Sequence, residues 1–192
     1  MTIEIETKGL DKAQALFRTA PEVAQRATEL AVLDTSSFAR RLSSTEIREE
    51  VNFKAGYLNE ERLSVTKKAN GFESEAVIRG RNRATSLAQF ASTPVSFGRK
   101  KRGIRVKVAR NGGDTLKNAF FVPLRNGNTG LAVRTKDGRP PSRGAVPIFK
   151  GAFLLYAPSV GQVFYDVASQ VVDRVSDKLV NEFTRQFERL FK

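Results

Sequence analysis

The chain has 192 residues, 40% of them hydrophobic, and contains neither cysteine nor histidine. It can therefore form no disulfide and no thiolate nucleophile or metal site, and it lacks the most common general base and metal ligand of proteins. Its 33 Lys/Arg and 20 Asp/Glu give a formal net charge of +13. These features argue against most catalytic constellations and predict one domain, residues 1–192, with a polyanionic or acidic partner.

The positive charge is concentrated in the middle of the chain. From Arg79 to Lys150 there are 17 Lys/Arg and two acids, which leaves 16 bases and 18 acids elsewhere. A nearly neutral frame with a basic centre predicts contact with nucleic acid or an acidic protein surface. No apolar run approaches the ~18 residues of a membrane span, and residues 1–4 do not resemble a secretory signal. We therefore expect no membrane partner, and synthesis in the cytoplasm.

The first fifty residues predict one strand followed by helices. Alternating isoleucine and glutamate over 2–7 is typical of a short strand. Helices are predicted over 11–19 and from Pro21 to about Leu42, since proline is well tolerated in a first turn. Ser44 begins a sequence that resembles a helix cap, which predicts a separate short helix with Glu46 to Glu50 as its acidic first turn.

The clearest hairpin signal lies further along the chain. The pair Asn70-Gly71 separates two apolar-alternating runs, and Asn-Gly favours a two-residue type I′ turn. Such a turn would place Val65 opposite Ala76 and Leu63 opposite Ile78. The apolar pattern agrees with this register, so we predict an antiparallel strand pair over 62–79.

The basic middle alternates between predicted strands and loops. Residues 103–110 predict a strand with an apolar inner face and a basic outer face, and 83–90 predict one or two helical turns. Two segments rich in proline, glycine and charge, at about 91–103 and 137–147, are predicted to project as basic loops. Further strands are predicted at 119–124 and 131–136, followed by an apolar segment over 146–155.

The longest predicted element is a helix from Pro158 to Phe191 with Ser159 as its N-cap. Apolar residues recur along it every three or four positions, between charged residues of both signs. We expect this stripe to be buried in the protomer or in a subunit interface, at Val163, Val167, Val171, Leu179, Phe183 and Phe187. The predicted class is α+β: antiparallel hairpins flanked by N-terminal helices and one long C-terminal helix.

The candidate interaction residues are basic. No predicted helix carries them into a DNA groove, and no aromatic ladder accompanies them, so neither base readout nor strand stacking is predicted. Phosphates and carboxylates remain as partners, and the abundance of arginine favours carboxylates for most of the cluster. No metal site, cofactor or catalytic residue is predicted. The residues expected to face DNA or a partner are Arg99, Lys100, Lys101, Arg102, Arg105, Lys107, Arg110, Arg139 and Arg143.

Five segments resemble, in order, the prophage minor tail protein Z family, and the resemblance as a whole covers about Arg41 to Leu190. They read FKAGYLNEERLSV (53–65), RATSLAQF (83–90), GIRVKV (103–108), AFFVPLRNG (119–127) and YAPSVGQVF (156–164). Ala157 stands where the family is expected to have glycine. The order and spacing of these segments, rather than any one motif, carry the resemblance.

The resemblance implies a structural virion protein of tailed phages, without enzymatic activity or cofactor, that completes the tail where it joins the head. More distantly, it implies likeness to neck and tail-terminator proteins, which form rings around the DNA channel. The implied partners are other copies of the chain, neighbouring neck, portal, adaptor or tail proteins, and DNA in the lumen. The alternative is a freestanding basic nucleic-acid-binding protein, and a small enzyme has almost no residues in its favour.

Overall fold

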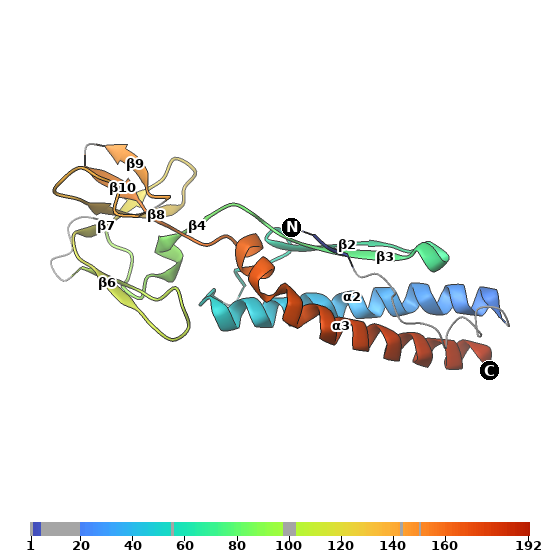
Figure 1. The fold of residues 1–192 in the computed structure, drawn as a ribbon. Helices are drawn as coiled ribbons and strands as arrows, with labels where there is room; N and C mark the ends of the chain where they lie inside the picture. Colours follow the sequence, from blue (N-terminus) through green and yellow to red (C-terminus); the bar gives the residue numbers. More distant parts are fainter. Residues whose placement is uncertain (1, 5–19, 55, 98–102, 143, 150) are drawn as a thin grey trace. The chain divides into compact units, whose positions relative to one another are not determined.

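The computed structural model describes residues 2–4, 20–54, 56–97, 103–142, 144–149 and 151–192. Two long helices and several small antiparallel sheets (Figure 1) confirm the predicted α+β class. The chain divides into two compact units, which we call the helical unit (Met1–Ile47, Asn59–Arg81 and Phe164–Lys192) and the sheet unit (Arg48–Leu58 and Asn82–Val163). The expectation of one domain stays a prediction, since this division describes contacts and not cooperative unfolding.

Helix α2 (Pro21–Glu50) is continuous, so the predicted break near Leu42 and the separate short helix are wrong. The Ser43 hydroxyl donates to the Ala39 carbonyl at 2.7 Å, and the Thr45 hydroxyl donates to the Arg41 carbonyl at 3.1 Å. Because these hydroxyls bond back into the same helix, they do not cap a new one. The helix predicted over 11–19 lies outside the described residues.

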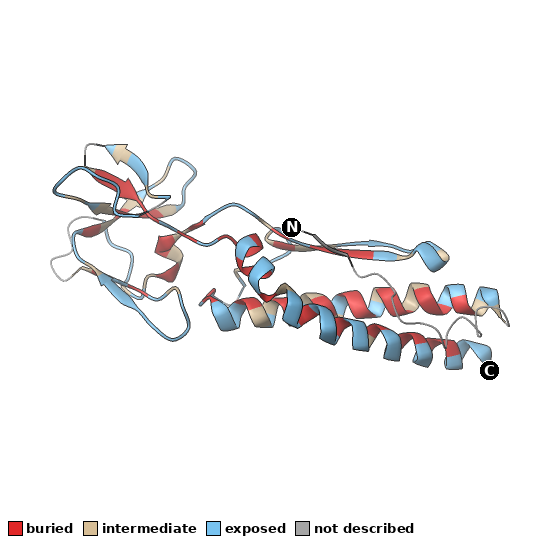
Figure 2. Cartoon of the chain, in the orientation of Figure 1, coloured by how far each residue is buried: buried red, intermediate tan, exposed pale blue. Residues whose placement is uncertain are grey.

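Helix α3 (Val160–Phe191) confirms the predicted terminal helix and its cap. The Gln162 amide donates to Ser159 Oγ at 3.1 Å, and the Ser159 amide donates to Gln162 Oε1 at 2.9 Å. This reciprocal pair is a capping box, which satisfies two amides that the helix itself leaves unpaired. The six stripe residues named from the sequence are all buried, whereas Phe191, the last apolar residue of the stripe, is 58% exposed (Figure 2).

In the helical unit, α2 and α3 run antiparallel. Glu46 pairs with Arg174 at 2.8 Å, and Asp34 accepts a hydrogen bond from Gln186 at 2.9 Å. A later residue of α3 therefore contacts an earlier residue of α2, as antiparallel helices require. The core between them combines small residues of α2 with large residues of α3. It contains Ala24, Ala27, Ala31 and Val32 of α2, Leu179, Phe183 and Phe187 of α3, and Ala76.

A three-stranded antiparallel sheet completes the helical unit, in the order β1 (Thr2–Glu4), β3 (Glu75–Gly80), β2 (Leu63–Lys68). The predicted hairpin exists, but its register is wrong by two residues: Val65 lies opposite Ile78 instead of Ala76. The turn is longer than two residues because the last strand pair is Lys68 with Glu75, and a 3-10 turn (η1, Gly71–Glu73) lies between them. A shift of two keeps every side chain on its predicted face, so Ala76 still joins the core.

The sheet unit is built around a four-stranded antiparallel sheet in the order β7-β8-β10-β9. Its strands are β7 (Ala119–Pro123), β8 (Thr129–Arg134), β9 (Val146–Phe149) and β10 (Ala152–Leu154). Two strand pairs, β5–β6 and β4–β11, and the 3-10 helix η2 accompany it. Their bounds are β4 Thr85–Ser86, η2 Leu87–Phe90, β5 Ile104–Val106, β6 Asp114–Leu116 and β11 Tyr156–Ala157.

Several sequence expectations for the sheet unit change in detail. The strands predicted at 103–110 and 119–124 are present with shorter bounds, and the strand predicted at 131–136 begins and ends two residues earlier. Strand β6 was not predicted, and 146–155 folds back as the hairpin β9–β10. The loop predicted at about 91–103 begins with residues that pair with β5 and do not project. Ala91 forms a β-bridge with Val106, and the Ser92 amide donates to the Arg105 carbonyl at 2.9 Å. Along the described parts of the chain, no helix is long and apolar enough to cross a bilayer.

The core position of Phe183 generates a stability prediction. Phe183→Ala should lower the free energy of unfolding by about 3–5 kcal/mol, because it empties a site between the two helices. Phe191→Ala is the matched control, and its cost should stay below about 1 kcal/mol because that ring is exposed. Urea unfolding followed by circular dichroism measures both, and equal losses would contradict this placement of the core.

A second prediction concerns Glu182, whose carboxylate accepts hydrogen bonds from Lys178 at 2.6 Å and Arg185 at 2.7 Å. The Lys178 bond, with a smaller contribution from Arg185, holds the pKa of Glu182 below its ordinary value of 4.5. The carboxylate therefore stabilises the fold above pH 4.5, and this contribution is lost as the pH falls through the lowered pKa.

Glu182→Gln should accordingly cost about 1 kcal/mol at pH 7 and much less at pH 3. Glu188→Gln, an exposed change on the same helix, is the control and should be nearly neutral at both pH values. Unfolding free energies at the two pH values test this, and a loss for Glu182→Gln that is the same at both would show that the charge contributes nothing.

Candidate interaction surface

The net charge of the chain resides in one unit. The helical unit contains 16 Lys/Arg and 16 Asp/Glu, whereas the sheet unit contains 17 Lys/Arg and four Asp/Glu, which gives it the whole +13. The basic middle of the sequence is thus largely a single folded body. Its surplus of cations creates a positive potential that attracts anionic groups.

Two of the predicted partner-facing residues lie together on the β5–β6 hairpin. Arg105 and Lys107 are exposed, while Ile104 and Val106, which alternate with them, are buried. A Cβ added at Gly113 would lie 3.6 Å from Arg105 Nε and 3.7 Å from Lys107 Cβ, so this glycine sits beside both side chains. The alternation predicted from the sequence therefore holds here, and it presents two cations on one face.

The other predicted partner-facing cations differ in their surroundings. Arg110 is exposed but forms an ion pair with Glu49, which neutralises part of its charge. Arg139 is exposed, and its backbone amide donates to Asp137 Oδ1 at 3.2 Å. The strongest cluster expected from the sequence, Arg99 to Arg102, lies outside the described residues, as does Arg143.

Pairing of the strands creates a cluster that the sequence analysis did not identify, in which Arg134 lies between two phenylalanines. Its guanidinium carbon is 5.7 Å from the ring centroid of Phe120 and 5.4 Å from that of Phe149, and the two centroids are 6.2 Å apart. The three residues belong to β8, β7 and β9. We call them the Arg134 cluster.

The sheet register explains why these residues meet. Arg134 lies opposite Ala152, and Ala152 lies opposite Phe149, so Arg134 and Phe149 share one face. Val146, opposite Leu154, lies on the same face. Phe120 joins them because β7 pairs with β8. The only signal in the sequence was the alternation within each strand, which cannot show which strands are neighbours.

The Arg134 cluster has the composition of a recognition site. Each cation–π contact contributes about 0.5–1 kcal/mol at an exposed site, and two rings restrict the guanidinium in advance of binding. None of the ion pairs formed by the described residues involves Arg134. Phe149 is 47% exposed and Val146 is also exposed. Aromatic residues and arginine are enriched at protein interfaces.

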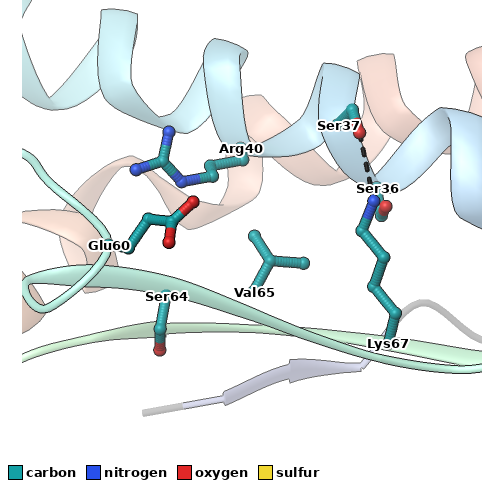
Figure 3. Close-up of a pocket in the computed structure, with 7 residues that line it drawn as sticks. All are labelled: Ser36, Ser37, Arg40, Glu60, Ser64, Val65 and Lys67. Carbon is teal, nitrogen blue, oxygen red and sulfur yellow. Dashed lines mark hydrogen bonds between the residues drawn. The ribbon is translucent and has the colours of Figure 1, made fainter.

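A separate groove of about 400 Å³ lies in the helical unit, between α2 and β2 (Figure 3). Lys67 Nζ donates there to Ser37 Oγ at 3.1 Å, and Arg40 Nε donates to the Leu63 carbonyl at 3.1 Å. These cations tie the hairpin to α2, so we interpret the groove as structural. It is lined by Ser36, Ser37, Arg40, Glu60, Ser64, Val65 and Lys67.

Two acidic residues near the end of α2 form ion pairs. Glu46 pairs with Arg174 and Glu49 pairs with Arg110. Within the described residues, no three carboxylates come close enough to hold a metal ion.

Comparison of the chain with protein-family models, with curated proteins and with solved structures gave no match. The resemblance to the minor tail protein Z family therefore stays a sequence-based expectation, and the function of the chain is argued below from its charge distribution and this surface.

The Arg134 cluster makes a testable prediction about coupling. In a double-mutant cycle, Arg134→Ala and Phe149→Ala should be coupled by about 0.5–1 kcal/mol, because each change removes the same cation–π contact. Arg125→Ala with Phe149→Ala is the control cycle and should give no coupling. Urea unfolding of the variants measures these energies, and equal coupling in both cycles would argue against a specific contact.

Proposed function

We propose that this chain is a structural component of a tailed-phage virion, which assembles into a homo-oligomeric ring at the junction between head and tail. The observation that carries the proposal is the partition of charge: a neutral helical unit and a sheet unit with all of the +13. A scaffold with one charged binding body suits assembly between protein layers. The ordered resemblance of about Arg41 to Leu190 to the minor tail protein Z family supplies the particular class.

The partners of such a ring are neighbouring neck, portal, adaptor or tail proteins, with DNA in the lumen as a further partner. DNA that passes through a channel must slide, so fixed bidentate contacts from every subunit would hold it back. Arginine forks suit stable pairing with carboxylates. We therefore assign most of the sheet unit's cations, Arg105 and the predicted Arg99 to Arg102 among them, to acidic protein surfaces, and the remainder to DNA.

The second candidate is a freestanding nucleic-acid-binding protein. It is favoured by Arg105 and Lys107, which are exposed side by side and absent from the ion pairs of the described residues. Light scattering and negative-stain microscopy separate the two candidates. Discrete rings favour the connector, whereas a monomer that binds DNA and is released by salt favours the binder.

The proposal predicts where the chain is found and what its loss does. In tailed particles purified from cells that encode the chain, immunogold label should mark the head–tail junction. Deletion of the coding region should leave separate heads and tails, which the native chain restores. A particle that is complete and infectious without the chain would contradict the proposed function.

Charge reversal tests the role of the sheet unit in the same assay. Arg105→Glu with Lys107→Glu should reduce the yield of joined particles at least tenfold, because a positive pair becomes negative. Lys117→Glu with Arg125→Glu changes the net charge equally in the same unit and is the matched control. If the Arg105/Lys107 variant joins heads to tails but packages or retains DNA poorly, those cations face the lumen instead.

A further inference from the structure

A second exposed surface lies on α3, away from its buried stripe. Tyr165, Val172 and Val180 are exposed, the first of them by 61%, although all three are large apolar residues. They are seven and eight residues apart, so at roughly 100° per residue they lie within an arc of about 80° and form one broad line along the helix.

Three aspartates follow this line. Asp166, Asp173 and Asp177 are all exposed, and their spacing of seven and four residues places them on one edge of the apolar line. The ion pairs of the described residues include none of them. We call the three aspartates, with Tyr165, Val172 and Val180, the acidic face of α3.

We infer that the acidic face of α3 binds the Arg134 cluster of a second copy of this chain. The inference rests on the proposed function and identifies the contact that builds the ring. Aspartates would meet the preorganised guanidinium of Arg134, and Tyr165 and Val172 would meet the exposed Phe149 and Val146. Each surface offers an apolar area together with a charge, and the two charges are of opposite sign.

The dimensions of the two surfaces are compatible. From Tyr165 to Val180 the line is about 22 Å long. Four strands about 4.8 Å apart, with their side chains, form a face roughly 15–20 Å wide. One helix can therefore lie across the whole sheet, and the flanking +13 of the sheet unit attracts the aspartates from a distance.

The partner that binds each surface is a second copy of the chain, because the acidic face of α3 and the Arg134 cluster are complementary to each other and neither is complementary to itself. A twofold contact through either surface alone would oppose like charges. A contact between two different surfaces is heterologous, so every bound copy offers a free surface to the next. Repetition of such a contact closes into a ring or continues as a filament, and a ring is the assembly proposed above.

Charge exchange between the two surfaces tests this inference. The native chain, at about 0.1 M salt, should form discrete oligomers in light-scattering and sedimentation measurements. Arg134→Glu alone and Asp173→Lys alone should each weaken association at least tenfold. A one-to-one mixture of these two variants should assemble again. In the mixture, the native Arg134 of one variant meets the native Asp173 of the other, and at the next junction the two exchanged charges meet each other.

Two exposed substitutions with the same changes of charge serve as matched controls. Arg125→Glu in the sheet unit and Glu61→Lys in the helical unit should leave association within about twofold of the native value. Circular dichroism establishes that each variant is folded. If Arg134→Glu does not fold, Arg134→Ala replaces it and should still weaken association.

The outcomes separate this inference from the function on which it rests. If the native chain assembles and neither Arg134→Glu nor Asp173→Lys affects assembly, the inferred contact is wrong but the proposed ring is not contradicted. If Arg134→Glu abolishes binding to DNA and not assembly, the cluster binds phosphate and the inference is also wrong. If the native chain stays monomeric at tens of micromolar, both the inferred contact and the proposed ring fail.

Discussion

The packing of α3 against α2 is the interaction on which the described structure of the helical unit depends. Alanines of α2 allow close approach, and Phe183 and Phe187 of α3 occupy the space that they leave. The buried residues of α3 from Val163 to Phe187 recur at every fourth position, along a ridge inclined about 26° to the helix axis. The buried side therefore turns around α3 along its length, and Ala76 of β3 adds the sheet to the same core.

Polar groups at this helix pair set its register. The buried Gln186 amide donates to Asp34, while Gln186 Oε1 and the Thr35 hydroxyl have no partner among the described residues. A buried polar group without a hydrogen bond costs about 1–3 kcal/mol. A slip of one turn would leave the Gln186 amide without its acceptor as well, so this cluster opposes alternative alignments that apolar packing alone would tolerate.

The two units use their charges differently. In the helical unit many charges pair within the unit, as Glu46 does with Arg174 and Glu182 with Lys178 and Arg185. In the sheet unit four acids can neutralise at most four of the 17 cations. The remaining cations are met by solvent ions or by a partner. Release of those ions on contact with an acidic surface or with phosphates favours association, and this makes the charge partition the basis of the proposed function.

Local chemistry in the sequence was enough to predict α3, its Ser159 cap, the strand that begins at Ala119 and the alternation of Ile104 and Val106. Each of these depends on residues within a few positions of one another. The hairpin turn, in contrast, makes a contact that no local pattern encodes, because the Gly71 amide donates to Glu29 of α2. The Arg134 cluster joins residues 14 and 15 positions from Arg134 along the chain. Strand alternation assigns each residue to a face, but only the tertiary pairing of β7, β8, β10 and β9 decides which faces meet.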